Sequence, residues 1–271
     1  MKHPKRPGVM SGIVTLTSDF GTADGYAGAL KGVILARLGT ARVVDLAHDL
    51  APGDVAAASE LLARAAPFFP PRTVHVAVVD PGVGTARRGL ALSLGEQLYV
   101  GPDNGIFTGV LELGATAAAR ALENWGLWRD SVSPVFHGRD IFAPVAAHLA
   151  GGGELRDVGP TVAADSLVRL PTPLPSGDPA ELRGEVVHVD RFGNLVTNLR
   201  APREPGAASL EVAGRALPLS RTYADVAPGA LVALVGSSGR IELALNGGSA
   251  ASHLEGGRGL VVILRAPRES A

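Results

Sequence analysis

Short apolar runs alternate with segments of helical spacing over the first half of the chain. Residues Ile13 to Thr17 and Arg42 to Leu46 are rich in β-branched side chains, and Thr73 to Asp80 is a nearly continuous apolar run. Apolar positions recur at helical spacing from Tyr26 to Leu38, and Asp54 to Ala66 is rich in alanine. This alternation predicts an N-terminal α/β domain with a largely parallel central sheet, whose ligand sites lie in loops after the carboxyl ends of the strands.

The pattern changes after a segment rich in glycine and proline. GGGELRDVGPTV and LPTPLPSGDP follow a helical pattern that runs from Asp140 to Ala150. From Glu185 onward, short alternating runs such as EVVHVD, ALVALVG and LVVIL are separated by turns, which predicts a smaller C-terminal antiparallel β-barrel domain. The expected boundaries are an N-terminal extension at 1–12, the α/β domain at 13–165, a linker at 166–183 and the barrel domain at 184–271.

Composition narrows the classes of protein that fit this pattern. The 271 residues are 46% hydrophobic and 19% charged, which is typical of a globular enzyme-sized chain. A net charge of -1 gives no basic field for nucleic acid. The absence of cysteine excludes disulfides and thiolate chemistry and fits the cytoplasm. The first twelve residues lack the apolar core of a signal peptide, no membrane span is expected, and Met10 is a candidate start.

Two acidic motifs follow predicted strands. Asp19 and Asp24 in TSDFGTADGY stand where a carboxylate can accept hydrogen bonds from ribose hydroxyls, although the local pattern by itself favours a helix cap and a turn. Asp80 opens DPGVGTARR, in which the glycines allow close approach of a ligand and Arg87 follows seven residues later. A tight turn with a surface ion pair explains this second motif equally well.

His137 in FHGRD precedes a predicted helix, where an imidazole can orient a water or a carboxylate. A lone histidine is more often structural, and Asp140 three residues later is expected to be a helix cap. No HExxH, CxxC or HxH pattern occurs, so no metal site is predicted. The chain also lacks the Walker, GxSxG and GxGxxG motifs, which argues against nucleotide triphosphatases, serine hydrolases and dinucleotide enzymes.

The C-terminal half offers a possible purine site. DRFGNLVTN places Asp190, Phe192 and Asn194 around a glycine, which can present an aromatic face and an amide to a base, but a hairpin turn explains the motif equally well. RTYADV with Tyr223, and GSSGRIELALN with Ser237 and Glu242, are equally ambiguous when each is taken alone.

Seven motifs in one order make the sequence more specific than any one of them. TSDFG, VVDPGVGTARR, GPDNG, FHGRDIFAP, DRFGNLVTN, RTYADV and GSSGRIELALN, spread from Ile13 to Asn246, resemble the S-adenosylmethionine hydroxide adenosyltransferase family, relatives of the bacterial fluorinase and chlorinase. The resemblance implies an α/β domain followed by a β barrel. It also implies a homotrimer whose substrate sits between the N-terminal domain of one subunit and the C-terminal domain of its neighbour.

The resemblance assigns residue roles by motif. The family's catalytic Asp, Arg and His fall on Asp80, Arg87 and His137. The aspartate of SDFG that binds ribose falls on Asp19, with Asp24 beside it, and the contacts to the adenine side fall on Asp190, Phe192, Asn194, Tyr223, Ser237 and Glu242. The halogenating relatives have a tyrosine in place of Asp80, and the fluorinase has a serine in place of Gly138. Arg240 replaces an aromatic residue that is usual in the GSSGRIEL segment.

These matches imply hydrolysis of S-adenosyl-L-methionine to adenosine and L-methionine, by in-line attack of water or hydroxide on the ribose C5'. In this interpretation Arg87 supplies positive potential, Asp80 accepts a proton or orients the water, and His137 fixes the geometry, with S-adenosylmethionine as substrate and no cofactor or metal. A chlorinase-like halogenase and a noncatalytic module that senses adenosine or S-adenosylmethionine are the alternatives.

Overall fold

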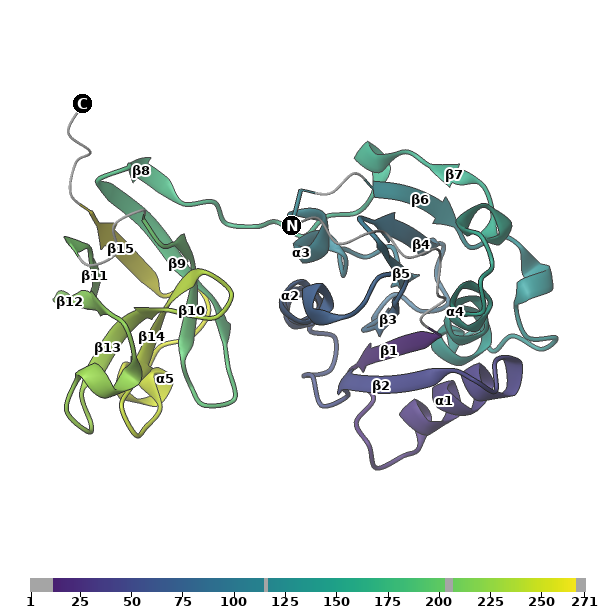
Figure 1. Cartoon of the computed structure of the whole chain (residues 1–271), viewed down its shortest axis with the longest axis horizontal. Coiled ribbons are helices and arrows are strands. Elements are labelled where there is room, and N and C mark those ends of the chain that lie inside the picture. Colours follow the sequence, from purple (N-terminus) through teal and green to yellow (C-terminus); the bar gives the residue numbers. More distant parts are fainter. Residues whose placement is uncertain (1–11, 115–116, 203–206, 267–271) are drawn as a thin grey trace, which may run out of the picture. The chain divides into compact units, whose positions relative to one another are not determined.

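The protein consists of two compact units, which a computed structural model describes over residues 12–114, 117–202 and 207–266. The division falls between Leu170 and Pro171, and each unit has its own sheet and hydrophobic core (Figure 1). Met10 and the rest of the expected extension before Gly12 lie outside the described residues.

A seven-stranded sheet forms the centre of the N-terminal unit (Figure 1). In chain order its strands are β1 (Ile13–Ser18), β2 (Arg42–Ala47), β3 (Val74–Val78), β4 (Gly89–Leu94), β5 (Gln97–Pro102), β6 (Ala117–Ala121) and β7 (Thr161–Val162), and in space they follow the order β2-β1-β3-β5-β4-β6-β7. The pairs β1–β2, β1–β3 and β3–β5 are parallel, whereas β4–β5, β4–β6 and β6–β7 are antiparallel. The α/β class is thus confirmed, and the parallel strands occupy one half of the sheet, because the short turn at Gly95 between β4 and β5 permits only an antiparallel pair.

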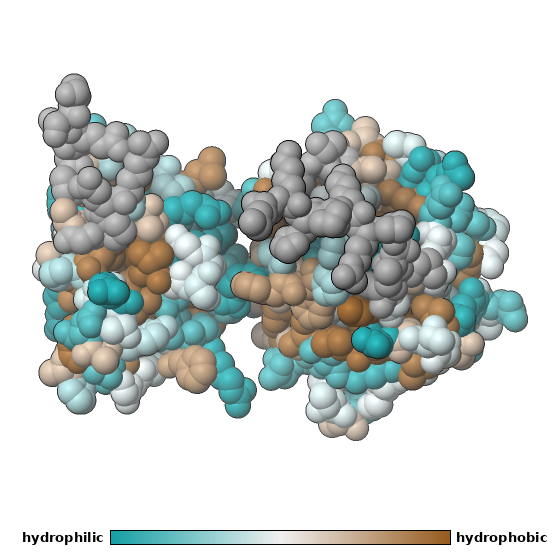
Figure 2. Space-filling view, viewed as in Figure 1, coloured by the Kyte–Doolittle hydropathy of each residue, from teal (hydrophilic) through white to brown (hydrophobic). Residues whose placement is uncertain are grey.

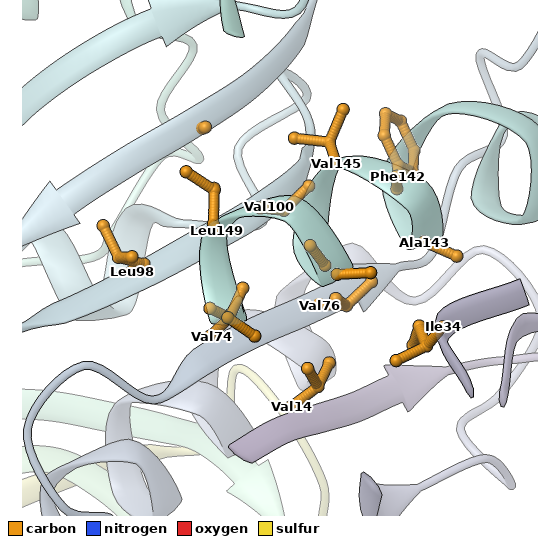
Figure 3. Packing of buried hydrophobic residues seen from close by; sticks show 14 of the residues in the cluster. Val14, Ile34, Val74, Val76, Leu98, Val100, Phe142, Ala143, Val145 and Leu149 are labelled. Carbon is orange, nitrogen blue, oxygen red and sulfur yellow. The ribbon is translucent and has the colours of Figure 1, made fainter. Parts of the chain in front are cut away.

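Helices cover both faces of this sheet. The α-helices of the unit are α1 (Tyr26–Arg37), α2 (Val55–Ala65), α3 (Thr108–Leu111) and α4 (Ala143–Ala150). Shorter turns are the 3-10 helices η1 (Ala66–Phe68), η2 (Trp125–Leu127), η4 (Leu155–Val158) and η5 (Ala164–Ser166), and the π-helical turn η3 (Gly138–Phe142). Ile34 of α1 and Leu149 of α4 pack with Val14 and Val76 on one face (Figure 3). Leu62 of α2 and Val110 of α3 belong to the core on the other face.

The C-terminal unit is a closed barrel. Its strands are β8 (Ser176–Asp178), β9 (Glu181–Val189), β10 (Leu195–Arg200), β11 (Ser209–Val212), β12 (Arg215–Ser220), β13 (Leu231–Val235), β14 (Arg240–Leu245) and β15 (Val261–Arg265), with the short helices η7 (Tyr223–Asp225) and α5 (Ala250–His253). The spatial order is β10-β14-β13-β12-β11-β15-β9-β8, and a pairing of β10 with β9 closes the ring. The predicted barrel is confirmed.

One pair of barrel strands departs from the expected antiparallel pattern. β12 and β13 run parallel, with Leu219 opposite Ala233. Residues 221–230, which include η7, form a connection long enough to carry the chain back before β13 begins. Alternation along the strands fills the interior: in β15, Val262 and Leu264 are buried, whereas Val261 is exposed.

The surface carries scattered hydrophobic residues among hydrophilic ones (Figure 2). Trp125 in the N-terminal unit and Phe192 and Tyr223 in the barrel are among the large hydrophobic side chains that are exposed. Within the described ranges, none of the helices combines the length and the apolar character that crossing a membrane requires.

Candidate active site

Asp80 stands in the loop that leaves the carboxyl end of β3, and this loop folds back on itself. Val83 N–H donates to the Asp80 carbonyl at 3.1 Å, and Thr85 donates from both its N–H and its hydroxyl to the Gly82 carbonyl, at 3.2 and 2.7 Å. Arg87 N–H then donates to Thr85 Oγ1 at 3.3 Å. Two consecutive turns therefore bring Arg87 back beside Asp80, although seven residues separate them in the sequence.

Gly84 is the residue in this loop whose backbone requires glycine. Its φ of +79° lies in the left-handed region, and a Cβ built there would stand 2.7 Å from the Pro134 carbonyl oxygen. The loop thus packs directly against the segment that leads to His137. The glycine of DPGVG serves this close approach of two protein segments.

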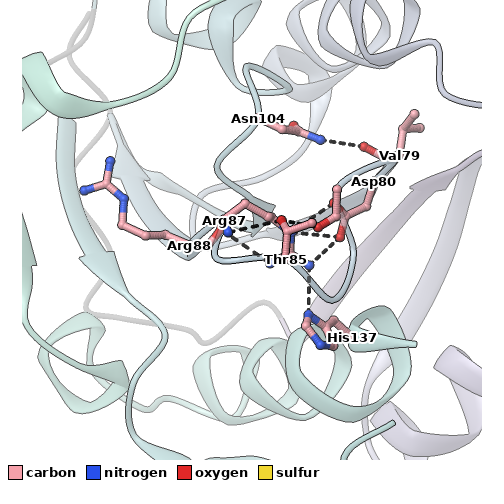
Figure 4. Close-up of polar contacts among 8 residues, drawn as sticks. Val79, Asp80, Thr85, Arg87, Arg88, Asn104 and His137 are labelled. Carbon is pink, nitrogen blue, oxygen red and sulfur yellow. Dashed lines mark hydrogen bonds and ion pairs between the residues drawn. The ribbon is translucent and has the colours of Figure 1, made fainter. Parts of the chain in front are cut away.

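Arg87 connects the other two residues of the predicted triad, Asp80 and His137 (Figure 4). Its Nε donates to Asp80 Oδ1 and Oδ2 at 2.9 and 3.0 Å, its Nη2 also bonds Asp80 Oδ2, and the same Nη2 lies 2.9 Å from His137 Nδ1. The side chains of Asp80 and Arg87 are only 5% and 11% exposed. A shielded, two-pronged ion pair of this kind is much more rigid than the surface pair that the turn interpretation requires.

The bond between Arg87 and His137 fixes the tautomer of the imidazole. Arginine has donors only, so His137 Nδ1 must accept and the proton of the neutral ring is on Nε2. Burial, and next the positive charge of Arg87, lower the pKa of His137 below its ordinary value of 6.5, against the opposing charges of Asp80 and Asp140. His137 is therefore neutral at pH 7 and keeps its contact with Arg87.

The lowered pKa of His137 predicts how kcat depends on pH. Protonation of His137 replaces the accepted hydrogen bond by two facing cations, so we expect kcat to fall on an acidic limb that lies below pH 6.5 and disappears in His137→Gln. The folded protein also binds this proton less readily than the unfolded chain, so His137 costs stability as pH falls below 6.5. A kcat profile between pH 4.5 and 9 tests this, and an acidic limb shared equally by His137→Gln would contradict it.

Asp140 holds the segment that carries His137. Its fully buried carboxylate accepts from Ser133 N–H at 2.8 Å and from Arg139 Nε at 2.7 Å, and Arg129 lies 3.6 Å away. The expectation that Asp140 caps a helix is wrong. The chain enters a π-helical turn at Gly138, before α4, so Asp140 lies inside the helical run and its carboxylate faces the preceding loop.

Asp19 lies at the end of the neighbouring strand, β1. Its Oδ2 accepts from Gly53 N–H at 2.8 Å, and the adjoining Ser18 hydroxyl contacts His48 Nδ1 at 2.7 Å. Asp19 does not cap a helix, since Gly25 precedes α1. Asp24 is exposed in the bend before that helix and lies outside the lining of the cavity described next.

A cavity of about 150 Å³ brings three of the predicted residues together. Asp19, Asp80 and His137 line it, and apolar side chains complete its walls: Phe20, Val78, Pro81, Val83, Val135 and Phe136, with Gly53 and Gly138. Sequence reasoning did not single out Phe20 and Phe136, although each adjoins a predicted residue in SDFG and FHGRD. Their rings meet edge to face at 5.7 Å and form an apolar wall in the cavity that Asp80 and His137 also line.

The predicted residues of the barrel gather around two features. The first is a hairpin between β9 and β10, in which Asp190 Oδ1 accepts from Phe192 N–H and Asn194 N–H at 2.8 and 2.9 Å, and Oδ2 accepts from Asn194 Nδ2 at 2.9 Å. The hairpin interpretation is therefore confirmed for these polar atoms. The Phe192 ring remains 76% exposed and free to stack on a flat ligand.

The second feature joins Tyr223 to Glu242. The Tyr223 hydroxyl donates to Glu242 Oε1 at 2.6 Å, and this bond, followed by burial and the charges of Glu242 and Asp190, raises the pKa of Tyr223 to about 12. Asp190 is thus close to this pair as well. Ser237 is exposed in the turn between β13 and β14.

The acidic and histidine side chains of the site form pairs with arginine and other groups. Across the described ranges, no group of three or more His, Cys, Asp or Glu side chains converges in a way that could hold a metal ion. Arg87 is not part of the cavity lining, but it forms an ion pair with Asp80, which is.

Comparison with known proteins connects both units to one family. Residues 14–159 match the N-terminal domain of the SAM hydroxide adenosyltransferases, and residues 184–263 match the C-terminal domain. The chain is 46% identical over 243 residues to a protein of Salinispora tropica named (R)-S-adenosyl-L-methionine hydrolase, covering 89% of this chain and 93% of the relative. A Thermus thermophilus protein of the same name is 44% identical, covering 88% and 93%. A fluorinase of an Actinoplanes species is 30% identical, covering 86% and 91%.

Solved structures of similar proteins share the fold. An uncharacterized conserved protein from Thermotoga maritima superimposes with a TM-score of 0.85 at 35% identity, covering 93% of this chain and 99% of the other. A conserved hypothetical protein from Thermus thermophilus gives a TM-score of 0.77 at 45% identity, covering 93% and 98%.

Proposed function

The chain belongs to the SAM hydroxide adenosyltransferase family, and on that premise we propose how its residues hydrolyse S-adenosyl-L-methionine to adenosine and L-methionine. The observation that supports the mechanism is the position of Arg87, which bonds Asp80 and His137 at the wall of one cavity. The two hydrolase relatives described above carry (R) in their names, which supports the (R) epimer at the sulfonium as the substrate.

The reaction needs an activated nucleophile more than an activated leaving group. The water oxygen forms a bond to the ribose C5', and the bond from C5' to sulfur breaks with its electron pair moving to sulfur. Sulfur therefore leaves as a neutral thioether without a proton donor. Free water has a pKa of about 15.7, so the site must favour hydroxide character in the attacking water.

Each member of the triad has a part in this activation. Asp80 accepts three contacts from Arg87, which leaves lone-pair capacity for the proton of a water. Arg87 provides the positive potential that stabilises the developing charge, and His137 presents the Nε2–H that its tautomer leaves available for the water. Asp19 holds the ribose hydroxyls so that C5' faces the water in line with sulfur.

The chemistry is proposed to require neither metal nor cofactor. Arg87 already supplies the cation that a Lewis acid would provide, and the sulfonium brings its own leaving group. The absence of cysteine fits action in the reducing cytoplasm.

The experiment that tests this function uses separated epimers. Purified protein is incubated with the (R) or the (S) epimer in a chloride buffer containing EDTA, and nucleosides and amino acids are quantified. We expect equimolar adenosine and methionine from the (R) epimer and no 5'-chloronucleoside. The sensor alternative predicts tight binding with unchanged substrate, and the halogenase alternative predicts the chlorinated product.

The complete site is proposed to lie between two copies of the chain in a homotrimer. The cavity in the N-terminal unit, about 150 Å³, is smaller than the roughly 300 Å³ at which pockets for drug-sized ligands begin. The exposed Phe192 and Tyr223 of the barrel offer aromatic faces for the adenine. The family resemblance assigns these faces to a neighbouring subunit.

Mixing two impaired variants tests the shared site. Tyr223→Ala is expected to lower kcat/KM about tenfold or more, because stacking on a base contributes about 1–3 kcal/mol. When Asp80→Asn and Tyr223→Ala chains are refolded together in equal amounts, about one quarter of the sites recover both intact halves if each site is built from two copies. Activity that stays at the sum of the separate variants would show that each chain builds its own site.

A further inference from the structure

The GPDNG motif has no part in the mechanism above, yet two of its residues lie at the ends of the catalytic loop. Asp103 and Asn104 follow β5, the parallel neighbour of β3. Asn104 Nδ2 donates to the carbonyl of Val79 at 2.8 Å, and Val79 directly precedes Asp80 (Figure 4). Asp103 N–H donates to the carbonyl of Arg88 at 2.9 Å, and Arg88 directly follows Arg87.

The side chain of Asn104 makes a hydrogen bond just beyond the last backbone bonds between β3 and β5. Leu98 N–H donates to the Thr73 carbonyl at 3.0 Å, and in a parallel pair the donors of one strand recur every second residue. That alternation reaches Pro102, which has no N–H to donate. Two residues later, the side chain of Asn104 donates to Val79 in place of a backbone amide. The ladder is thereby extended to the residue before Asp80.

Asp103 holds the other end of the loop through its side chain as well. Its buried carboxylate accepts from Arg88 Nε at 3.0 Å and from Val168 N–H at 2.9 Å. Arg88 Nη2 also donates to the carbonyl of Ser166 at 2.6 Å. Both ends of the segment from Val79 to Arg88 are therefore tied to one dipeptide.

We propose that Asn104 is a positioning residue for hydrolysis, which acts by fixing the backbone of Asp80 relative to Arg87, with Asp103 fixing the opposite end of the loop. The inference rests on the proposed function of the triad. Asn104 lies outside the cavity lining and so contacts no substrate there. Its influence passes through the Val79 carbonyl to the carboxylate that receives the proton.

The size of the effect follows from the geometry of in-line attack. Arg87 binds Asp80 from within the loop, so the pair remains intact if the whole loop shifts against the sheet. Such a shift moves the pair away from Asp19 on β1, which orients the ribose. A displacement of about 1 Å at a reacting group costs about 100-fold in rate, while substrate contacts made elsewhere are kept.

Asn104→Asp and Asn104→Ser test this position. Both variants keep an oxygen that can accept from Ile106 N–H, as Asn104 Oδ1 does at 3.2 Å. Neither can replace the bond to Val79, because the carboxylate has no proton to donate and the serine hydroxyl is one bond shorter than the amide. We expect kcat with the (R) epimer to fall about 10- to 100-fold, with KM within about threefold of the wild-type value. The two variants must show the same loss of kcat. Only Asp adds a charge, so a loss shared with Ser is due to the missing amide donor.

Asn124 offers a matched control in the same unit. Its Nδ2 donates to the carbonyl of Asp157 at 2.7 Å and its Oδ1 accepts from Gly126 N–H at 3.1 Å, which repeats the bonding of Asn104 at a turn outside the cavity lining. Asn124→Asp and Asn124→Ser should lower the melting temperature about as much as the corresponding Asn104 variants do, and they should leave kcat unchanged.

Each outcome of this comparison is decisive. Loss of kcat in both Asn104 variants, at preserved KM and with both Asn124 variants active, supports the positioning role. Equal kcat in the Asn104 and Asn124 variants, or a change confined to KM, overturns it. Unfolding of both Asn104 variants at a temperature where the Asn124 variants stay folded also overturns it, since the residue would then be a general structural support. A wild-type protein that does not hydrolyse the substrate would instead refute the proposed function.

Discussion

Asp80→Asn is expected to lower kcat about 10²- to 10⁴-fold and to change KM little. The amide keeps the shape of the side chain and one oxygen for Arg87, but it cannot take a proton from the attacking water. Its NH₂ group would also face the guanidinium donors that now bind the carboxylate. Steady-state kinetics with the (R) epimer measures the effect.

Asp157→Asn is the control for this substitution. Asp157 is likewise a paired carboxylate, with His148 at 3.0 Å as its partner, but it lies outside the lining of the cavity. Its variant should keep kcat near the wild-type value. An Asp80→Asn protein with normal kcat and a normal melting temperature would remove Asp80 from the mechanism.

Arg87→Met is expected to destabilise the protein by about 3–5 kcal/mol and to abolish measurable turnover. The substitution leaves the Asp80 carboxylate, 5% exposed, without its cation. Adding Asp80→Asn in the same chain removes the unpaired charge, so the double variant should recover most of the lost stability and none of the activity. Urea unfolding of the wild type, the two single variants and the double variant measures this cycle.

Stability and activity together show whether Arg87 is a catalytic charge or only a structural support for the turn that holds Asp80. If Arg87 only held a turn together, the double variant would regain stability and would be as active as Asp80→Asn alone. If the losses in stability of the two single variants simply added in the double variant, the residues would not be coupled. Either result would contradict the interpretation of Arg87 as the charge that holds Asp80 and stabilises the attacking hydroxide.

Local patterns were sufficient to predict the elements that carry the triad. The apolar run from Thr73 to Asp80 contains β3, and the alanine-rich stretch contains α2, because continuous burial and helical spacing leave a direct trace in the sequence. Placing Asp80 at the carboxyl end of a parallel strand then located the cavity. The order of seven motifs identified the family, which neither fold nor composition could do.

Features that depend on long-range pairing were not accessible from local patterns. The parallel pairing of β12 with β13 depends on the path of residues 221–230, which has no sequence signature. Asp140 looked like a helix cap because it precedes an apolar helical run, but the π-helical turn at Gly138 begins two residues earlier. The bond from Asn104 to Val79 depends on the register of β5 against β3, which brings two segments that are distant in the sequence side by side.

The cavity combines an ion pair with an apolar wall, and this combination suits displacement at a sulfonium. In the mechanism we propose, Phe20 and Phe136 reduce the access of bulk water around the single water that reacts, and the low polarity strengthens the field of Arg87. Phe136 is itself fixed by Arg139, whose guanidinium carbon lies 4.8 Å from the ring centre. The loop that holds His137 is thereby braced through both Arg139 and Asp140.

The most direct test of the central claim, attack of water on C5', is the fate of its oxygen. The purified protein is incubated with (R)-S-adenosylmethionine in oxygen-18 water, and the oxygen-18 content of the products is measured by mass spectrometry. We predict one labelled oxygen in adenosine, located on C5', with equimolar unlabelled methionine. Unlabelled adenosine, or cleavage to methylthioadenosine, would contradict the mechanism.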